Sequence, residues 1–494
     1  MFPLRQYQTE DLANVRGEFA SGFKHVLYQL PTGGGKTVTS SHMIKGAEDR
    51  GHPSLFTAHR REIIYQTEAK LVEAGIDYNM IMAGEKPSIT HTVNLASIQT
   101  LIRREYPNAK FIIIDEAHHA PAVTYQKVIE QYPEAWILGL TATPCRTDGR
   151  GLGGVFERMV CGPSVRELID LGFLVPPRIF TADIPSLEDL RISMRDYDQD
   201  DAEALLNTPK LVGDIVEHYL EIGEGRKFIA FTSRVAHSLS LTEAFLHAGV
   251  KVEHLDGTTP TEVRKGILAR HKSGETTGIC NCGVLTEGYD DPTIECVIIA
   301  RPTKSFGLYL QMSGRGLRPS EPTGKKNLLL LDHASCYNEH GGPDEPVAWS
   351  LDPGKPAAQV DDKVREESTI MTQWVCGLCR FVNQAGNYCA SCGMRKTTNA
   401  IAPVVAQGKL TEVTDQKRRK LGKAEKHDVW EKCVWEQIMI DRRGGKGRKI
   451  GAAFHAFVKK TGQQPHYSYP MMPQRGQWQM RASKWYDIHK ARGG

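Results

Sequence analysis

A glycine-rich stretch at residues 30–37 has the composition of a phosphate-binding loop. It reads Leu-Pro-Thr-Gly-Gly-Gly-Lys-Thr and follows an apolar run. Glycines let the backbone aim N–H groups at phosphate oxygens, a lysine can reach the terminal phosphates, and a threonine hydroxyl can ligate Mg²⁺. The alternative is a glycine turn without nucleotide, which the position between a predicted strand and a predicted helix disfavours. The nucleotide-binding residues are then Gly33, Gly34, Gly35, Lys36 and Thr37.

Two carboxylates could complete this site with a metal ion. Asp115 and Glu116 follow the apolar run 111–114, and a strand that ends beside a phosphate loop would bring them close to it. Mg²⁺ prefers oxygen ligands, so we expect Asp115 and Thr37 to hold the metal. Glu116 would polarise the attacking water. An Asp-Glu pair taken alone is usually a solvated turn, and the phosphate loop upstream favours the metal site.

Residues 115–118, Asp-Glu-Ala-His, resemble the box of superfamily 2 helicases of the DEAH type. Other stretches match motifs of that family in order: 4–8, 57–60, 97–100, 139–144, 231–233, 256–257, 285–290 and 311–318. The resemblance covers residues 1–335. It implies two RecA-like domains that bind ATP and Mg²⁺ between them and move along a nucleic-acid strand.

The resemblance also assigns roles to residues far from the phosphate loop. Arg5 and Gln8 match the adenine-sensing motif, in which the amide of Gln8 would read the base. Gly288 and Asp290 match the motif that touches both sugar-phosphate and ATP. These four residues are therefore expected to contact the nucleotide.

The stretch 311–318 matches the arginine-finger motif and supplies three further catalytic candidates, Gln311, Arg315 and Arg318. A guanidinium stabilises the charge that spreads onto the γ-phosphate oxygens, and such a finger contributes roughly 10³-fold or more to turnover. The resemblance places both arginines across the cleft from the phosphate loop. Hydrolysis would therefore require the two domains to close.

Four cysteines fall within 17 residues, and the other seven are scattered. Two Cys-x-x-Cys pairs at this spacing suit four thiolates on a structural, tetrahedral Zn²⁺. A redox pair is the alternative, but redox motifs come singly. Trp374 and Asn383 make the segment resemble a zinc finger of the Ran-binding-protein type, with one residue fewer after Asn383 than that family has. The expected zinc ligands are Cys376, Cys379, Cys389 and Cys392.

Charge is distributed unevenly along the chain. The net charge is +4, yet from residue 393 to the end 22 Lys and Arg stand against 8 Asp and Glu. Trp478, Trp485 and Tyr486 lie among these cations, which is typical of a grip on single-stranded nucleic acid. The alternative is a small helical module whose aromatic residues form its own core. No window approaches 18 consecutive apolar residues, so no membrane partner is expected.

Apolar runs separated by amphipathic stretches predict the elements that position these residues. The runs lie at 24–31, 54–58, 111–114, 136–140, 227–231, 278–282, 296–299 and 327–331, with helical stretches such as 61–74 and 235–248 between them. Strands that alternate with helices predict parallel sheets. The fold class is α/β, with two RecA-like parallel-sheet domains in tandem, then a small zinc-binding module and a basic helical C-terminal region.

The expected domain limits follow composition. A polar, strand-poor segment separates two groups of runs, and a second polar stretch, rich in Pro and charge, precedes the cysteines. The limits are 1–180 for the ATP-binding RecA-like domain, 181–212 for a linker or insertion, 213–350 for the second RecA-like domain, 351–372 for a linker, 373–396 for the zinc finger and 397–494 for a basic nucleic-acid-binding or interaction region.

Together these features predict an ATP-dependent DNA helicase or translocase acting in repair, recombination or replication. The whole chain resembles the RadD-type helicases of bacteria and phages, so the cytoplasm of a bacterial or phage-infected cell is the expected location. Expected partners are DNA and, through the zinc module or the tail, replication or repair proteins. An RNA helicase, a non-hydrolysing adaptor and the translocating subunit of a restriction system are the alternatives, although the chain shows no nuclease motif.

Overall fold

The computed structural model describes residues 3–85, 91–146, 149–181, 190–193 and 196–352, with four short strands at 358–360, 374–375, 382–383 and 411–412. The chain forms two compact units. Unit 1 comprises residues 1–360 and 399–412, and unit 2 holds the remainder. Nearly all described residues belong to unit 1, which contains both seven-stranded sheets.

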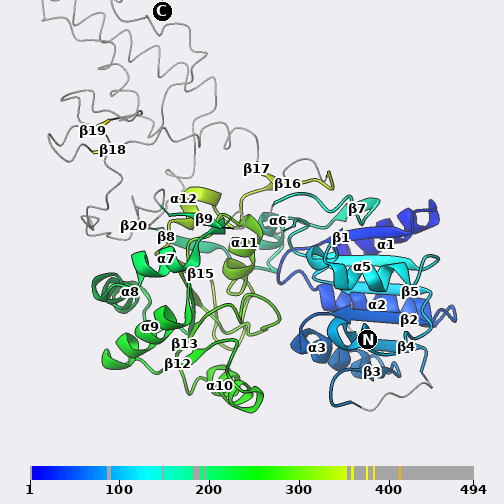
Figure 1. Ribbon diagram of the computed structural model, residues 1–494, viewed down its shortest axis with the longest axis horizontal. Coiled ribbons are helices and arrows are strands. Elements are labelled where there is room, and N and C mark those ends of the chain that lie inside the picture. Colours follow the sequence, from blue (N-terminus) through cyan, green and yellow to red (C-terminus); the bar gives the residue numbers. More distant parts are fainter. Residues whose placement is uncertain are drawn as a thin grey trace, which may run out of the picture. The chain divides into compact units, whose positions relative to one another are not determined.

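The first sheet has seven strands in the order β3-β4-β2-β5-β6-β1-β7, all parallel (Figure 1). Apolar runs such as 111–114 are buried throughout, as expected of parallel strands covered on both faces. The strands are β1 (His25–Gln29), β2 (Ser54–Ala58), β3 (Asn79–Ile81), β4 (Val93–Ser97), β5 (Phe111–Asp115), β6 (Trp136–Thr141) and β7 (Arg158–Cys161).

Helices connect the strands of this first domain, and its core contains Leu27, Ile112 and Phe156. Local signals explain where helices begin. Ser164 precedes the last helix of this domain. Its hydroxyl accepts a hydrogen bond from the N–H of Glu167, and its own backbone N–H donates to the Glu167 carboxylate. The helices are α1 (Gln6–Ala20), α2 (Lys36–Glu48), α3 (Arg61–Glu73), α4 (Ile98–Leu101), the 3₁₀ turn η1 (Ala117–His119), α5 (Val123–Glu130) and α6 (Val165–Asp170).

The second sheet also has seven strands, in the order β12-β13-β11-β14-β15-β8-β20. Six are parallel, and β20 pairs antiparallel with β8 at the edge. The strands are β8 (Pro177–Thr181), β11 (Phe228–Thr232), β12 (Val252–Leu255), β13 (Gly278–Asn281), β14 (Cys296–Ala300), β15 (Leu328–Asp332) and β20 (Thr411–Glu412). The fold is therefore α/β with two parallel-sheet domains, as the sequence predicts.

Among the described residues, six helices belong to the second domain, whose core contains Phe228, Phe245 and Leu329. Thr208 caps one of them, and Pro209 occupies its first turn, where a missing N–H costs nothing. The helices are α7 (Gln199–Leu206), α8 (Pro209–Ile222), α9 (Val235–His247), α10 (Thr261–Ser273), α11 (Phe306–Gly314) and α12 (Cys336–His340). A hairpin of β9 (Ile192–Ser193) and β10 (Asp196–Tyr197) precedes α7, and β16 (Val347–Trp349) pairs with β17 (Ala358–Val360).

Three expected limits differ from the observed elements. Residues 177–180, assigned to the first domain, belong to β8 and are hydrogen-bonded into the second sheet. The expected linker 181–212 contains the β9–β10 hairpin, α7 and the start of α8. Residues 411–412, expected in the basic C-terminal region, form the edge strand β20. The second domain therefore draws strands from both sides of its expected limits.

Unit 2 is described only by β18 (Trp374–Val375) and β19 (Val382–Asn383), an antiparallel pair. The cysteines Cys376, Cys379, Cys389 and Cys392 and the basic, aromatic tail lie outside the described residues. Within the described part of the chain, no helix combines the length and the apolar character needed to cross a bilayer.

Candidate functional site

The glycine-rich loop joins the end of β1 to the start of α2. Gly33 and Gly35 have φ angles of 85° and 93°, a region that glycine enters without steric strain. Lys36 is the first residue of α2, and its Nζ donates a 3.0 Å hydrogen bond to the carbonyl of Leu30. The loop therefore curls around the lysine side chain and leaves the N–H groups at the start of α2 without helical partners, an arrangement suited to an anion.

The two carboxylates of the box stand at the end of β5. Both Asp115 and Glu116 are buried, and Glu116 has φ 50°, an uncommon conformation for a residue other than glycine. Burial and then the charge of Glu116 raise the pKa of Asp115 to about 7. Burial lowers the pKa of Lys36 against the opposing influence of both carboxylates. A dication would relieve the cost of ionising this pair, so the residues fit Mg²⁺.

Several buried polar atoms in this region lack a hydrogen-bond partner among the described residues. Among them is Oε2 of Glu116, which has an ion-pair contact with Nδ1 of His118 at 3.5 Å. Another is Nε of Arg318. Buried polar atoms are usually hydrogen-bonded, so an orphaned carboxylate oxygen and an orphaned guanidinium nitrogen fit a site that receives a ligand.

The adenine-sensing candidates hold the glycine loop itself. The Gln8 side-chain N–H donates to the carbonyl of Gly34 at 3.0 Å, and the Tyr7 hydroxyl donates to the same carbonyl at 2.7 Å. Oε1 of Gln8 accepts from the N–H of Arg5, whose guanidinium stacks over the ring of Phe173 at 4.0 Å. Contact of Gln8 and Arg5 with a base stays a prediction, and the structure adds that Gln8 supports the loop.

The two arginines of 311–318 have different surroundings. Arg315 is buried and donates 2.7 Å and 3.3 Å hydrogen bonds to the carbonyls of Tyr289 and Gln311. Arg318 pairs with Asp290 and packs against the glycine loop, since a Cβ on Gly33 would lie 2.9 Å from Cγ of Arg318. Burial lowers the pKa of Arg318 to about 10. Arg318 therefore faces the loop from the second domain, and Arg315 organises that domain.

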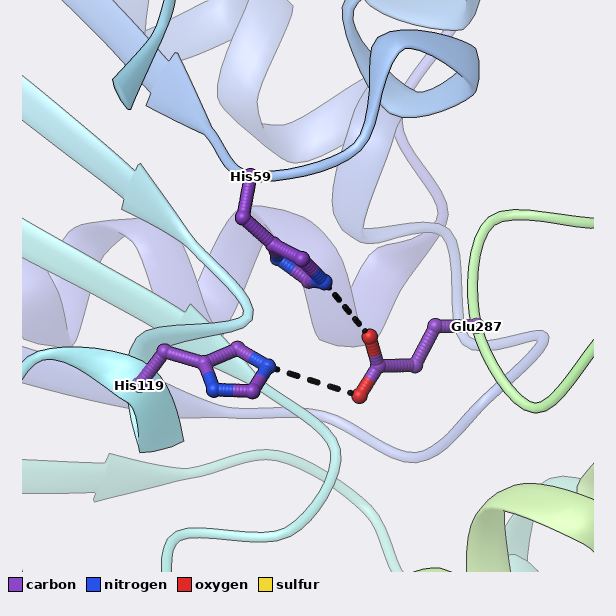
Figure 2. A group of neighbouring side chains, drawn as sticks. All are labelled: His59, His119 and Glu287. Atoms are coloured by element: carbon purple, nitrogen blue, oxygen red, sulfur yellow. Dashed lines mark ion pairs between the residues drawn. The ribbon is translucent and has the colours of Figure 1, made fainter. Parts of the chain in front are cut away.

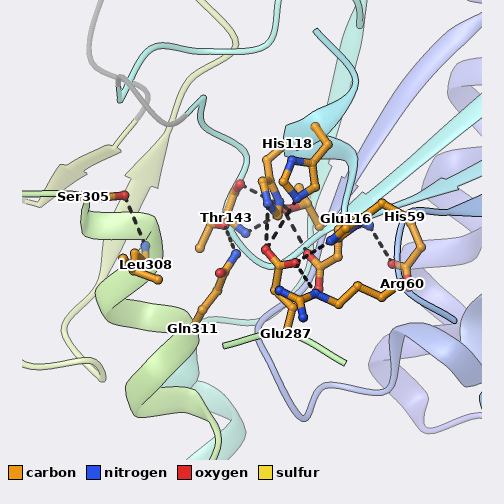
Figure 3. A network of polar contacts seen from close by, with 12 residues as sticks. His59, Arg60, Glu116, His118, Thr143, Glu287, Ser305, Leu308 and Gln311 are labelled. Atoms are coloured by element: carbon orange, nitrogen blue, oxygen red, sulfur yellow. Dashed lines mark hydrogen bonds and ion pairs between the residues drawn. The ribbon is translucent and has the colours of Figure 1, made fainter. Parts of the chain in front are cut away.

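A short polar chain links the box to Gln311 in α11, the helix that precedes Arg315 and Arg318 (Figure 3). Nδ1 of His118 lies 3.3 Å from Oγ1 of Thr141, which also accepts the N–H of Thr143 at 3.1 Å. The hydroxyl of Thr143 accepts from Nε2 of Gln311 at 3.4 Å. Gln311 therefore contacts the first domain, and this contact depends on where residues 115–118 lie.

Glu287 lies within the matched stretch 285–290, but the sequence assigned it no role of its own. Its carboxylate crosses from the second domain into the first, with Oε2 at 2.8 Å from Nε2 of His59 and 3.2 Å from Nε of Arg60 (Figure 3). Oε1 lies 3.3 Å from Nε2 of His118 and 3.5 Å from Nε2 of His119. The available signal was a set of three histidines. His59 lies in the matched stretch 57–60, His118 ends the matched stretch 115–118, and His119 follows it.

His118, His119 and Glu287 shift one another's pKa values. Despite its burial, Glu287 has a pKa well below its usual range because His118, His119 and His59 favour the ionised form. Burial opposes protonation of His118, but Glu287 and Glu116 outweigh it and raise its pKa. Burial lowers the pKa of His119. The site therefore holds an ionised Glu287 next to a neutral His119.

The loop that carries Glu287 is docked on the first domain by further contacts. The Gln66 side chain in α3 donates to the carbonyl of Gly288 at 2.8 Å, and Arg60 donates to the carbonyl of Val284 at 2.9 Å. Gly288 has φ 76°, and a Cβ there would lie 3.5 Å from Cδ of Arg60. The loop 284–290 thus contacts the start of α3 on one side and Arg318, through Asp290, on the other.

Comparisons with known proteins match this arrangement. The family model described as "Type III restriction enzyme, res subunit" matches residues 1–146, and "Helicase conserved C-terminal domain" matches residues 211–320. A 51.5 kDa protein of a Lactococcus phage is 32% identical over 323 residues, which cover 65% of this chain and 68% of that protein. The chain belongs to helicase superfamily 2.

Other relatives of this superfamily 2 chain match a similar share of it. IRC3 of Saccharomyces cerevisiae, assigned as an ATP-dependent helicase, is 32% identical over 64% of this chain and 49% of its own length. A fragment assigned to the HsdR subunit of a type I restriction enzyme from Vibrio vulnificus has a TM-score of 0.56 at 25% identity and covers 69% of this chain and 66% of that one. The chain spans about half to two thirds of these relatives.

Proposed function

We propose that this superfamily 2 chain is a DNA motor that couples ATP hydrolysis to movement on DNA, or to its remodelling, in repair, recombination or replication. The observation that carries the proposal is the meeting of Lys36 and Glu116, from the first domain, with Arg318 from the second. Arg318 packs on Gly33 of the phosphate loop, and its charge acts on Lys36. A γ-phosphate held by the loop would therefore contact cations of both domains.

Each residue has a distinct part in this mechanism. Bound Mg²⁺–ATP supplies the γ-phosphoryl group, which is transferred to water. Asp115 and Thr37 would hold the metal, and Lys36 with the N–H groups at the start of α2 would orient the phosphates. Glu116, whose Oε2 accepts no hydrogen bond, would take the proton of the attacking water. Arg318 would stabilise the charge that develops on the phosphoryl oxygens.

Two connections couple this chemistry to movement. The Gln311–Thr143 contact joins α11 to the loop after β6, and the loop 284–290 is docked on α3. Both connections exist only while the domains are closed. Loss of the γ-phosphate would weaken the attraction of Arg318 to the first domain, so hydrolysis would release these contacts and let the domains separate.

DNA is favoured over RNA as the track. The sequence of the phosphate loop, the box and the four-cysteine segment are typical of DNA translocases, and both a matched family model and a similar solved structure come from restriction enzymes. The RNA helicase is the second candidate. A non-hydrolysing adaptor is disfavoured because Lys36, Glu116 and Arg318 are all present, and the charges of Glu116 and Arg318 both act on Lys36.

The parts outside the described residues are proposed to extend the motor. We keep the expected Zn²⁺ site at Cys376, Cys379, Cys389 and Cys392, and nucleic-acid binding by the basic tail. The RadD-like branch, the repair or replication partners and a bacterial or phage-infected cytoplasm remain predictions. The proposed domain limits now place the change from the first to the second domain between β7 and β8.

The test is the ATPase rate of the full chain with single-stranded DNA, duplex DNA, forked DNA and RNA. We expect DNA to stimulate the rate more than RNA does, and Glu116→Gln to abolish the rate in every case. Equal or greater stimulation by RNA would favour the RNA helicase. An ATPase rate indistinguishable from that of Glu116→Gln under all four conditions would favour the adaptor.

A deletion tests the tail separately. Because β20 belongs to the second sheet, the deletion begins at residue 413. Loss of 413–494 should weaken DNA binding and reduce its salt dependence, since fewer cations then contact phosphates. DNA affinity that matches the full chain at every salt concentration would contradict a role of the tail in binding.

A further inference from the structure

Three side chains on both sides of the domain interface bring metal-ligating atoms together. One nitrogen each of His59 and His119 and a carboxylate oxygen of Glu287 all lie within 4.8 Å of one another. Figure 2 shows both imidazoles pointing toward the Glu287 carboxylate. His59 follows β2 and His119 ends η1, both in the first domain, whereas Glu287 belongs to the second. The matched helicase motifs assign no metal to this group, which is separate from Asp115 and Thr37.

The distances suit a shared ion as well as direct contact. Nε2 of His59 lies 2.8 Å from Oε2 of Glu287, and Nε2 of His119 lies 3.5 Å from Oε1. Ligands about 2.1 Å from one metal ion are about 3.0 Å apart at right angles and about 3.4 Å apart at the tetrahedral angle. At 3.5 Å the contact of Nε2 of His119 with Oε1 is at most a weak one, and this nitrogen is a buried atom without a well-formed hydrogen bond among the described residues.

The donor set selects the class of metal. Two imidazole nitrogens and a carboxylate oxygen suit Zn²⁺, Ni²⁺ or Co²⁺, whereas Mg²⁺ prefers oxygen ligands and water. His118, with Nε2 at 3.3 Å from Oε1 of Glu287, could supply a fourth ligand.

We propose that His59, His119 and Glu287 form a binding site for a divalent transition metal, with Zn²⁺ as the physiological ion, that ties the two domains together. Arg60 also contacts Oε2 of Glu287, at 3.2 Å, so the ion competes with a guanidinium for the carboxylate. The site is therefore weaker than a closed four-ligand zinc site. It is complete only when the domains are closed, so metal binding and closure favour each other.

The consequence for activity rests on the proposed function. A motor of this kind must open and close once per ATP, and an ion with ligands from both domains resists opening. The metal would therefore act as a brake that slows ATP turnover, and a chelator would release it. Binding itself does not depend on whether the chain hydrolyses ATP.

The binding test uses the full chain, purified with Zn²⁺ so that any cysteine site is filled, dialysed against a weak chelator that empties the weaker histidine site, and then titrated with NiCl₂ alone by calorimetry. We expect the wild type to bind one Ni²⁺ more than His119→Ala or His59→Ala, because the cysteine contribution cancels in this difference. His254→Ala is the matched control, since its Nε2 lies 3.3 Å from Asp256 in a histidine–carboxylate pair that has no third metal-ligating side chain among the described residues. It should bind Ni²⁺ as the wild type does.

A second probe identifies the ligands. Co²⁺ bound by imidazole and carboxylate gives visible bands without the intense near-ultraviolet absorption of thiolate ligands, and this spectrum should vanish in both histidine variants. Equal Ni²⁺ stoichiometry in wild type and both variants, or a Co²⁺ spectrum dominated by thiolate absorption, would overturn the site. Loss of one ligand should weaken binding by more than about tenfold, because even outer-shell partners have effects of that size.

The brake is measured as the ATPase rate with excess Mg²⁺, before and after Ni²⁺, each variant being compared with its own metal-free rate. Inhibition should appear in the wild type, be reversed by chelator, and be reduced about tenfold or more in sensitivity in His119→Ala. Ni²⁺ bound through His119 without any inhibition would overturn the brake. A chain that binds Ni²⁺ through His119 but never hydrolyses ATP would contradict the motor and leave the metal site intact.

Discussion

The side-chain amide of Gln66 in α3 donates a 2.8 Å hydrogen bond to the backbone carbonyl of Gly288 in the second domain. This bond fixes the loop 284–290, which carries Glu287 and Asp290, against the first domain. Gly288 is suited to the contact because its φ of 76° is a backbone conformation that glycine adopts without strain. A movement of α3 would therefore displace this loop and, with it, Asp290, the ion-pair partner of Arg318.

Gln66→Ala should open the two domains without damaging either. Loss of one amide–carbonyl bond costs about 1 kcal/mol, so the ratio of closed to open molecules should fall about fivefold. Energy transfer between dyes at the exposed positions Val123 and Val263, one in each domain, measures this ratio. Gln126→Ala removes a similar 2.7 Å bond to the carbonyl of Ala120 within the first domain and should leave the transfer efficiency unchanged. Equal effects of the two substitutions would contradict the docking role.

Lys36→Ala and Glu116→Gln should separate nucleotide binding from hydrolysis. Lys36 is the cation of the phosphate loop, so its loss should abolish turnover and weaken ATP binding. Glu116→Gln keeps the shape of the side chain but cannot accept a proton, so ATP should bind without being hydrolysed. Nucleotide affinity and phosphate release distinguish the two results. Turnover near the wild-type rate in either variant would show that the assigned site is wrong.

Arg318 and Arg315 should differ in what their loss does. Arg318→Ala should reduce turnover roughly 10³-fold with a small change in Tm, because its ion-pair partner Asp290 has a side chain that is 48% exposed. Arg315→Ala should reduce turnover and also lower Tm, because it leaves the buried carbonyl of Tyr289 without its 2.7 Å donor. Kinetics and thermal unfolding of both variants test this contrast, which equal Tm losses would refute.

Central strands could be predicted from the sequence because they are buried on both faces and therefore read as unbroken apolar runs. The strands that were not predicted have physical reasons to escape notice. β3, β7 and β12 lie at sheet edges and are short. β4 is central and buried but contains Asn94, whose side chain accepts a 3.0 Å hydrogen bond from Asn79 in β3. Because these two polar side chains are hydrogen-bonded to each other, β4 can be buried without appearing as an apolar run in the sequence.

The phosphate loop and the box could be predicted because each needs only neighbouring residues in the chain. The contacts of Glu287 could not be predicted, because its partners approach it only when two separately folded domains close. These partners are His59, Arg60, His118 and His119. The supporting role of Gln8 escaped for the same reason. Its amide contacts the carbonyl of Gly34, 26 positions away. Motif matching assigns a residue to a site and leaves its contacts open.

Metal analysis should find about one Zn²⁺ per chain held by thiolates, because a four-cysteine site binds zinc tightly at neutral pH. Cys389→Ser should lose that ion, whereas His119→Ala should keep it. Zinc measured after dialysis against a weak chelator distinguishes the thiolate site from the weaker histidine site. Wild-type protein without zinc would refute the four-thiolate prediction.

Substitutions at Asp291 and at its neighbour Asp290 should differ in their effect on stability. The Asp291 side chain is fully buried and accepts hydrogen bonds from Lys227 at 3.1 Å and from the hydroxyl of Thr293 at 2.6 Å. Removing one partner of a buried ion pair costs about 3–5 kcal/mol, so Asp291→Asn should lower the free energy of unfolding by about that amount at pH 7. Asp290→Asn, at a half-exposed position, should change stability little.

The pH dependence of this loss has a definite sign. Despite burial, His271, Thr293 and Lys227 hold the pKa of Asp291 well below its usual range. A carboxylate with a lowered pKa stabilises the fold above its unfolded value of about 3.9, and this contribution disappears as the pH falls through the folded value. The stability difference between wild type and Asp291→Asn should therefore shrink below about pH 4. Urea unfolding followed by circular dichroism between pH 3 and 8 measures it, and a difference that stays constant with pH would show that Asp291 is not ionised in the folded domain.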